Sequence, residues 1–416
     1  MKKNDTQTTM KIPIKLIDYV KEYYDTSKLS EAIRKGLKEY ILLPVEVQNI
    51  DSFEIHQLLD IKDRVDVRCV SIRIPAEFKE FILNMTEEDF QVTVSMILAK
   101  MIINPLDKAD FRNSCLLHVL GSKWNVRMQK AIKYIQETSG KTWAISVETC
   151  AGALGIHMNA TFANKEIIND DDMEKINLYR VIQEYPTELK IKCLLMEPTK
   201  DYFDVIKKEK VHLITPIDIN AAARFLFLNI LSYRNTGNTF DNAMTVTKYR
   251  RALDSIYPFH QHLKDTKICE NDIFKIIGKY KKSDNTLFIV DPTYLDANVY
   301  KNRSIRSEAT HGKEFGLKEH KKLAKMLYQE NKQGNDFIYF CRTTAKREKY
   351  KENGCLKLST DKLIQNDRHM KGMIDDLYYG HGFYYMDVPL DGETIERIIT
   401  SFNFEGANLY REGELQ

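Results

Sequence analysis

From about residue 110 onward, short apolar runs alternate with segments of helical periodicity, and this alternation constrains the fold more than any other feature. The apolar runs fall at residues 144–147, 166–168, 287–290 and 337–340, and helical spacing covers residues 173–182 and 317–327. Strands that alternate with helices predict an α/β fold with a mostly parallel sheet covered on both faces. Ligands of such sheets bind outside the carboxyl ends of the strands, so the residues after each run are the candidates for chemistry.

The composition sets the class of protein without indicating its function. The 416 residues, 43% of them hydrophobic and 29% charged, are enough for two or three packed domains. No apolar run has the length of a membrane span, and the polar start does not resemble a signal peptide, so no membrane association is expected. The seven cysteines form no C-x-x-C pair. We therefore expect a cytoplasmic protein of prokaryotic, phage or plasmid type, with no metal site.

The first hundred residues contain a weak internal repeat, in which the second copy follows the first by 62 residues, from Lys11 to Arg73. Each copy begins with a short alternating strand that ends in a proline, and continues into two helical segments. In the first strand Thr9 and Lys11 share a polar face, and in the second strand Ser71 and Arg73 do so. The other face of both strands is apolar.

This strand–helix–helix unit resembles the ribbon-helix-helix family of DNA-binding domains. In that family two units pair, and their strands form an antiparallel ribbon that lies in the major groove. The resemblance implies an α+β DNA-binding region at residues 1–105. The base-reading residues that it implies are Thr9, Lys11, Ser71 and Arg73. The copies can pair within one chain or between chains, which would give a homodimer, and the alternative is a pair of helical hairpins that pack on the rest of the protein.

Four segments, one before the first predicted sheet strand and three at predicted strand ends, carry side chains suited to one chemistry. They are Leu120–Lys123, Glu148–Gly155, Asn169–Asp172 and Asp291–Tyr294. A glycine turn after a first strand lets the backbone approach a nucleotide-like ligand, and an acid after the second strand accepts hydrogen bonds from ribose hydroxyls. Asp-Pro-x-Tyr offers a carboxylate, a carbonyl and an aromatic face, which suit the exocyclic amine and ring of a base drawn out of a duplex.

Taken in this order, the segments resemble the DNA adenine methylase family, which transfers methyl from S-adenosylmethionine to N6 of adenine. The family's Gly-Gly-Lys, Glu-Pro-Phe-x-Gly-x-Gly, Asn-Asp-x-Asp and Asp-Pro-Pro-Tyr motifs match the four segments in turn, and the resemblance runs from about residue 116 to about 404. It implies a Rossmann-like methyltransferase sheet with double-stranded DNA as partner. The residues it implies for S-adenosylmethionine are Lys123, Glu148, Cys150, Gly152 and Asp170. Those it implies for catalysis are Asp291, Pro292 and Tyr294.

The chain departs from the family motifs at several positions. Thr149-Cys150 replaces Pro-Phe, Leu154 stands where the family has glycine, and Thr293 replaces the second proline. A side chain at position 154 would crowd the backbone approach to the methyl donor, unless Gly155 restores the turn. The change at Thr293 is milder, because the proposed acceptors on residues 291 and 292 are retained.

The domain boundaries also follow from the resemblance. The methyltransferase domain is expected at residues 110–228 and 284–410, with a helical target-recognition insertion at 229–283. The insertion residues expected to contact DNA are Arg234, Asn235, Arg250 and Arg251. A solvated basic surface explains these residues equally well.

Two functions remain open. The first is an active adenine methyltransferase whose N-terminal region tethers it to DNA. The second is a DNA-binding regulator, partition or anti-restriction protein with a catalytically silent methyltransferase fold. Leu154 and Cys150 favour the silent protein, whereas the retained Asp170, Asp291 and Tyr294 favour the enzyme.

Overall fold

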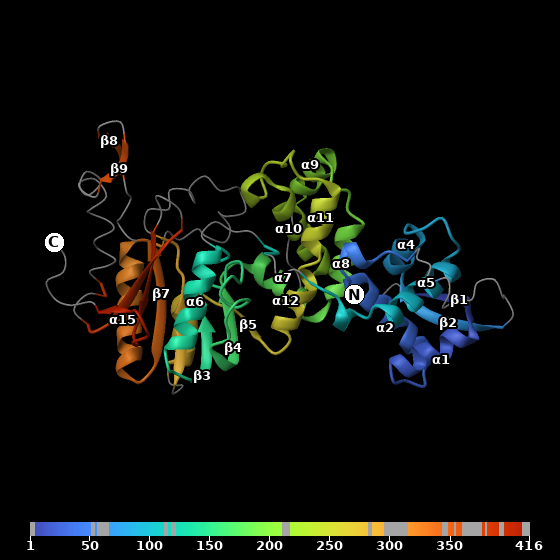
Figure 1. Cartoon of the computed structure of the whole chain (residues 1–416), viewed down its shortest axis with the longest axis horizontal. Coiled ribbons are helices and arrows are strands. Elements are labelled where there is room, and N and C mark those ends of the chain that lie inside the picture. Colours follow the sequence, from blue (N-terminus) through green and yellow to red (C-terminus); the bar gives the residue numbers. More distant parts are fainter. Residues whose placement is uncertain are drawn as a thin grey trace. The chain divides into compact units, whose positions relative to one another are not determined.

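The chain forms two compact units, each made from two stretches of sequence (Figure 1). The first unit comprises Met1–Leu117 and Arg180–Gln261, and the second comprises His118–Tyr179 and His262–Gln416. The computed structural model describes residues 5–50, 55, 66–111, 115–117, 122–209, 217–281, 285–294, 315–342, 348–352, 355–359, 377–378, 381–390 and 395–409.

The N-terminal part of the first unit contains the two predicted strand–helix–helix repeats. The first repeat consists of β1 (Asp5–Pro13), α1 (Ile14–Tyr23) and α2 (Leu29–Leu42). The second consists of β2 (Val67–Pro75), α4 (Ala76–Leu83) and α5 (Phe90–Ile103). Short 3-10 turns, η1 (Val45–Val47) and η2 (Leu106–Lys108), follow α2 and α5. In both repeats the proline that ends the strand is the residue directly before the first helix.

The two strands pair with each other in an antiparallel ribbon within one chain. The apolar residues of the ribbon are buried under the helices, with α5 packed on β1 and α2 packed on β2. These buried residues are Met10, Ile12, Val70, Ile72 and Ile74. The predicted alternation of the two strands is therefore confirmed, and their polar faces point away from the helices.

Helices make up the second stretch of the first unit. They are α8 (Pro186–Leu194), α9 (Lys200–Lys208), α10 (Ile219–Leu231), η3 (Tyr233–Asn235), α11 (Val246–Leu253) and α12 (Ile256–Leu263). Helix α8 packs on α2, α4, α10 and α11. Because of this packing, residues 180–228 group with the N-terminal repeats, whereas the sequence had suggested that they belong to the methyltransferase domain.

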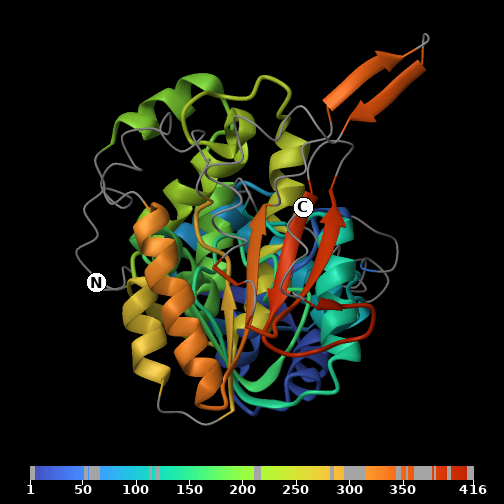
Figure 2. The same cartoon turned by 90° about the vertical axis from the view of Figure 1, so that its left-hand side faces the viewer.

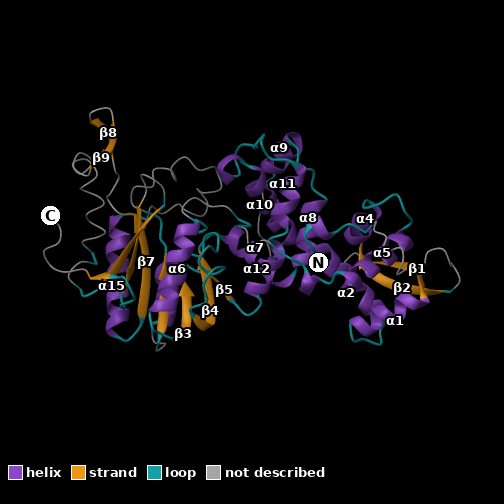
Figure 3. Cartoon of the chain, viewed as in Figure 1, coloured by secondary structure: helices purple, strands orange, loops and turns teal. Residues whose placement is uncertain are grey.

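An eight-stranded mixed sheet forms the centre of the second unit (Figure 3). Its strand order is β12-β10-β11-β7-β6-β3-β4-β5, and β7, β6, β3, β4 and β5 run parallel to one another. The strands are β3 (Trp143–Glu148), β4 (Ala163–Asp170), β5 (Lys267–Glu270), β6 (Thr286–Val290), β7 (Asp336–Arg342), β10 (Tyr384–Pro389), β11 (Ile395–Thr400) and β12 (Asn408–Leu409). A separate hairpin contains β8 (Glu348–Glu352) and β9 (Cys355–Ser359).

Helices cover both faces of this sheet, as the alternation of strands and helices predicted (Figure 2). On one face, α13 (Ile273–Tyr280) and α15 (Leu317–Lys332) pack on Phe288 and Val290 of β6. On the other face, α6 (Val126–Thr138) packs on Leu287 and Ile289 of the same strand. Helix α7 (Met173–Glu184) follows β4 and contains the boundary between the two units. The second unit is therefore an α/β structure, and β6 is buried from both sides.

Candidate functional site

The Asp-Pro-Thr-Tyr loop begins at the carboxyl end of β6, between the ends of β3 and β7. The Nζ atom of Lys123 lies 2.9 Å from Oδ1 and 2.8 Å from Oδ2 of Asp291. The same ammonium donates a hydrogen bond to the hydroxyl of Tyr294 at 3.0 Å. Lys123 is only 3% exposed. The structure thus brings together one predicted donor-site residue and two of the three predicted catalytic residues.

Gly155 allows the backbone of Lys123 to approach the turn after β3. A Cβ atom at position 155 would lie 2.9 Å from the carbonyl carbon of Lys123 and 3.0 Å from its nitrogen. The indole Nε1 of Trp124 donates to the carbonyl of Ala153 at 2.9 Å, which joins the same two segments a second time. Gly155 is therefore required for the position of the lysine, a role that the sequence did not indicate.

We expect Gly155→Ala to destabilise the second unit by about 1–3 kcal/mol, because the new methyl group meets backbone atoms that must shift to accept it. Gly278→Ala is the matched control, since a Cβ there meets no atom within 4 Å and alanine favours the helical backbone of α13. Chemical unfolding followed by tryptophan fluorescence measures both changes. Equal stability of the two variants would contradict the close contact.

Glu396 is a further member of the cluster, and sequence reasoning did not identify it. It lies on β11, it is buried, and its Oε2 atom is 3.5 Å from Nζ of Lys123. That oxygen has no hydrogen-bond partner among the described residues. The sequence does contain a signal for it. Glu396 alternates with Ile398 and Thr400, so all three side chains lie on the same face of the strand, and that face is buried.

Burial and neighbouring charges determine how Asp291 titrates. Burial is the main cause that raises the pKa of Asp291 to about 6, and the negative charge of Glu396 also raises it, while the ammonium of Lys123 lowers it. Glu148, the last residue of β3, is buried, and burial together with the charge of Asp291 raises its pKa well above the usual range. Burial therefore brings the pKa of Asp291 closer to neutral pH than that of an exposed aspartate.

The turn at Glu148–Gly155, which the sequence predicts to bind the methyl donor, follows β3 and contacts the end of β4. Asp170, the last residue of β4, accepts a hydrogen bond from the backbone N–H of Gly152 at 2.9 Å and one from that of Asp172 at 3.0 Å. Its Oδ1 also lies 3.4 Å from Nζ of Lys175. An ionised carboxylate has about four acceptor positions, so Asp170 retains capacity for a ligand hydroxyl.

The turn has two residues in the left-handed backbone region, Gly152 at φ +50° and Leu154 at φ +57°. Leu154 thus takes the conformation that glycine favours, at the position where the adenine methylase motif has glycine. Its side chain is fully buried. Cys150 is half-buried, and burial raises the pKa of its thiol well above the usual range, so the thiol is neutral and unsuited to act as a nucleophile.

Helix α15 contacts the Asp291–Tyr294 loop through His320. Burial lowers the pKa of His320 to about 4, so its ring is neutral at physiological pH. Nε2 lies 3.1 Å from the carbonyl oxygen of Thr293, and Nδ1 lies 2.8 Å from the hydroxyl of Tyr339. A ring that carries its proton on Nε2 satisfies both contacts, because it donates to Thr293 and accepts from Tyr339.

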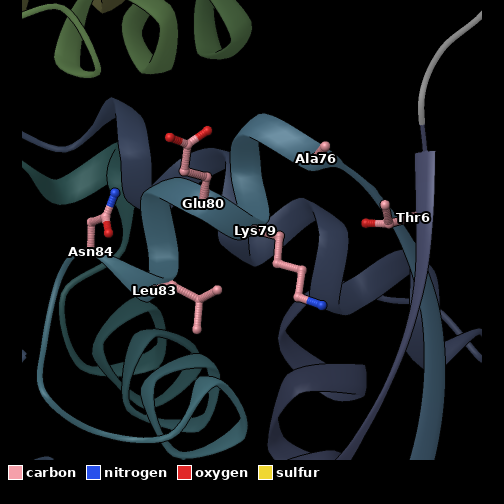
Figure 4. Close-up of a pocket in the computed structure, with 6 residues that line it drawn as sticks. All are labelled: Thr6, Ala76, Lys79, Glu80, Leu83 and Asn84. Atoms are coloured by element: carbon pink, nitrogen blue, oxygen red, sulfur yellow. The ribbon is translucent and has the colours of Figure 1, made fainter.

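The four predicted base readers in the N-terminal region all lie exposed on the outer face of the ribbon. The hydroxyls of Thr9 and Ser71 are 2.9 Å apart across the two strands. A surface pocket of about 260 Å³ lies on the inner side of the same ribbon, and its lining includes Thr6 of β1 and Lys79 of α4 (Figure 4). Since Thr6 alternates with Gln7 along β1, this pocket is not part of the outer face.

The predicted insertion residues occupy the helical part of the first unit, around α11 and η3. Asn235 donates from Nδ2 to the carbonyl of Asn229 at 3.0 Å and stabilises a turn at φ +55°. Arg251 is exposed and forms an ion pair with Glu46 at 2.9 Å. Arg250 is exposed, and the side chain of Arg234 lies outside the described residues.

No protein-family model matches the chain, and no curated protein matches its sequence. Within the described ranges, no helix is long and apolar enough to cross a membrane. The same part of the chain has no group of three or more histidine, cysteine or acidic residues placed to hold a metal ion.

Proposed function

We propose that the chain is a DNA adenine-N6 methyltransferase that uses S-adenosylmethionine and carries an N-terminal DNA-binding region. The observation that carries this proposal is the contact of Lys123 with Asp291 and Tyr294 at the carboxyl end of β6. The parallel strand order β5-β4-β3-β6-β7 supports a Rossmann-like sheet, because the order reverses between β3 and β6. Nucleotide ligands of such sheets bind in the crevice outside the strand ends at this reversal.

The residues at the ends of β3 and β4 fit the methyl donor. Asp170 has acceptor capacity for ribose hydroxyls, and the turn at Gly152 presents its backbone beside that carboxylate. S-adenosylmethionine supplies an electrophilic methyl group when bound. Lys123, Glu148, Cys150, Gly152 and Asp170 would hold it, and the buried side chain of Leu154 does not prevent this, because the side chain packs in the interior.

The loop after β6 suits adenine, the base that would accept the methyl group. The Asp291 carboxylate and the Pro292 carbonyl would accept hydrogen bonds from the exocyclic amine and stabilise the positive charge that develops on nitrogen. The ring of Tyr294 would stack on the extruded adenine, which contributes about 1–3 kcal/mol for bases on aromatic side chains. Positioning and electrostatics supply the rate enhancement, and no covalent intermediate with the protein is needed.

The test is transfer of labelled methyl from S-adenosylmethionine to unmethylated genomic DNA, followed by digestion to nucleosides. Label is expected on N6 of adenine with the native chain and not with Asp291→Ala. Asp265→Ala is the matched control, because Asp265 is an exposed aspartate of the same unit and lies outside the strand ends that form the site. If the native chain binds duplex DNA but no label appears on adenine, the proposal that the chain is a methyltransferase is wrong.

A DNA-binding regulator with a silent methyltransferase fold is the second candidate. The observation that favours it is the left-handed backbone of Leu154, which costs about 1–3 kcal/mol and replaces glycine in the donor turn. In this case the outer face of the ribbon would carry the function, and S-adenosylmethionine would bind without transfer or would not bind. Calorimetry with S-adenosylhomocysteine separates these two outcomes from each other, and the methyl-transfer assay separates both of them from an active enzyme.

A further inference from the structure

The register of the ribbon gives the first unit an internal two-fold axis. Thr9 pairs with Ser71 across the strands, and Ser71 is also the counterpart of Thr9 in the 62-residue repeat. A residue that pairs with its own counterpart lies on the axis that relates the two repeats. The axis therefore passes through the Thr9–Ser71 pair, at the centre of the outer face.

The two halves of this outer face carry different side chains. On one side of the axis Lys11 pairs with Cys69, and on the other side Gln7 pairs with Arg73. All four residues are exposed. Lys11 and Arg73 are counterparts and both are cationic, but Gln7 corresponds to Cys69, which has only a weak donor. One half is therefore a Gln–Arg pair and the other half is a Lys–Cys pair.

The charges that flank the two halves also differ. The backbone N–H of Lys11 donates to Oε1 of Gln91 at 3.2 Å, so the Lys–Cys half borders the start of α5. Three exposed acids precede that helix directly, namely Glu87, Glu88 and Asp89. The corresponding positions before α2, which packs on β2, are Asp25, Thr26 and Ser27, and exposed Lys28 follows them. The Gln–Arg half is therefore the more favourable half for a polyanion.

We propose that this face binds one B-form duplex as a single chain and reads a non-palindromic site, with the Gln–Arg half as the dominant reader. The inference rests on the proposed DNA binding of the N-terminal region and not on methyl transfer. Neighbouring strands are about 4.8 Å apart, so a two-stranded ribbon fits a major groove about 12 Å wide. Lys11 and Arg73 are four residues apart along the ribbon, or roughly 13 Å, and contact different base pairs.

The side chains predict the content of each half-site. Arg73 can donate two hydrogen bonds to O6 and N7 of guanine, and Gln7 can pair with N6 and N7 of adenine. Lys11 can also bind guanine, but without the planar fork of arginine. Cys69 cannot make a two-point contact. The half-site under Gln7 and Arg73 is therefore expected to be strongly specified, and the other half-site weakly.

The experiment is selection of bound duplexes from a random library by the full chain, at fixed salt and without S-adenosylmethionine. The expected result is an asymmetric consensus, bound with one chain per duplex in analytical ultracentrifugation. Arg73→Ala is expected to weaken binding about 10-fold or more and to relax one half of the consensus. Lys11→Ala is expected to weaken binding less than Arg73→Ala does. The loss of its positive charge is also expected to make the affinity less dependent on salt concentration.

The decisive variant gives the two halves the same base-reading side chains. The double variant Cys69→Gln and Lys11→Arg gives both halves a Gln–Arg pair on exposed positions, so the fold is not challenged, and its consensus is expected to become palindromic. A palindromic consensus of the native chain, two chains per duplex, or a consensus unaffected by Arg73→Ala would each overturn the inference while leaving DNA binding in place. Failure to bind any duplex would instead overturn the proposed DNA binding as well.

Discussion

Replacing Lys123 by methionine is expected to slow methyl transfer at neutral pH about 100-fold, as removal of one preorganised donor does elsewhere. The lysine contacts both the carboxylate of Asp291 and the hydroxyl of Tyr294, so its loss removes the ammonium between them, although the hydroxyl of Tyr294 still donates to Oδ1 of Asp291 at 3.3 Å. It also removes the positive charge that lowers the pKa of Asp291. In the proposed reaction the carboxylate of Asp291 must be ionised to accept hydrogen bonds from the adenine amine, so a higher pKa leaves less of the active form at pH 7.

The pH profile separates this role from a structural one. In the native chain kcat/KM is expected to rise with pH through a midpoint near 6, because Asp291 ionises there with a pKa of about 6. Lys123→Met is expected to move the midpoint upward. Glu396→Gln removes a negative charge that raises the same pKa, so it is expected to move the midpoint downward. Shifts in the same direction, or an unmoved midpoint in both variants, would contradict the proposed coupling.

The strands that carry the site could be predicted from the sequence because their burial follows directly from composition. Each residue of β6 is buried, and the apolar run at 287–290 indicates such a strand without any tertiary information. The Asp291–Tyr294 loop follows from that prediction, since it begins where the apolar run ends. The same reasoning placed Asp170 at the end of β4.

Glu396 and Gly155 depend on contacts between segments far apart in the chain. Glu396 meets Lys123 across more than half the sequence, because β11 inserts next to β7 in antiparallel orientation. The spacing of apolar residues along β11 does not indicate which strand it pairs with. The sequence leaves open whether Gly155 restores the turn. In the structure the left-handed residues of the turn are Gly152 and Leu154, and Gly155 makes room for the backbone of Lys123.

The grouping of residues 180–228 with the N-terminal repeats could not be predicted for a similar reason. The helices there have ordinary amphipathic patterns, which show that a face is buried but not against which partner. One contact within this group is polar and joins α8, the segment after α2 and the end of α11. Its centre is Lys190, whose side chain shows no pattern in the sequence that distinguishes it from a surface lysine.

Lys190→Met is expected to lower the free energy of unfolding of the first unit by about 3–5 kcal/mol, as loss of one partner of a buried ion pair does. Lys190 is 1% exposed, and its ammonium donates to Oδ1 of Asp254 and to the carbonyl of Leu43, both at 2.9 Å. The other oxygen of Asp254 accepts from the backbone N–H of Val45 at 3.1 Å. Methionine fills the volume but leaves Oδ1 of Asp254 without its cation, while the carbonyl of Leu43 keeps a hydrogen bond from Nε2 of Gln48 at 2.9 Å. The change would therefore loosen the contact between the N-terminal repeats and the helices of residues 180–261.

Two probes distinguish the units in the unfolding measurement. Both tryptophans, Trp124 and Trp143, belong to the second unit, so their fluorescence reports on that unit, while far-ultraviolet circular dichroism reports on both. Lys190→Met is expected to shift the circular dichroism transition more than the fluorescence transition. Lys192→Met is the matched control on the same helix, because its pair with Glu77 is partly exposed at 3.4 Å.

Adding Asp254→Asn to Lys190→Met should recover part of the loss, since the amide oxygen still accepts from Val45 and no charge remains buried. If the double variant is as unstable as the single one, the buried charge is not the cause and the account of this contact fails.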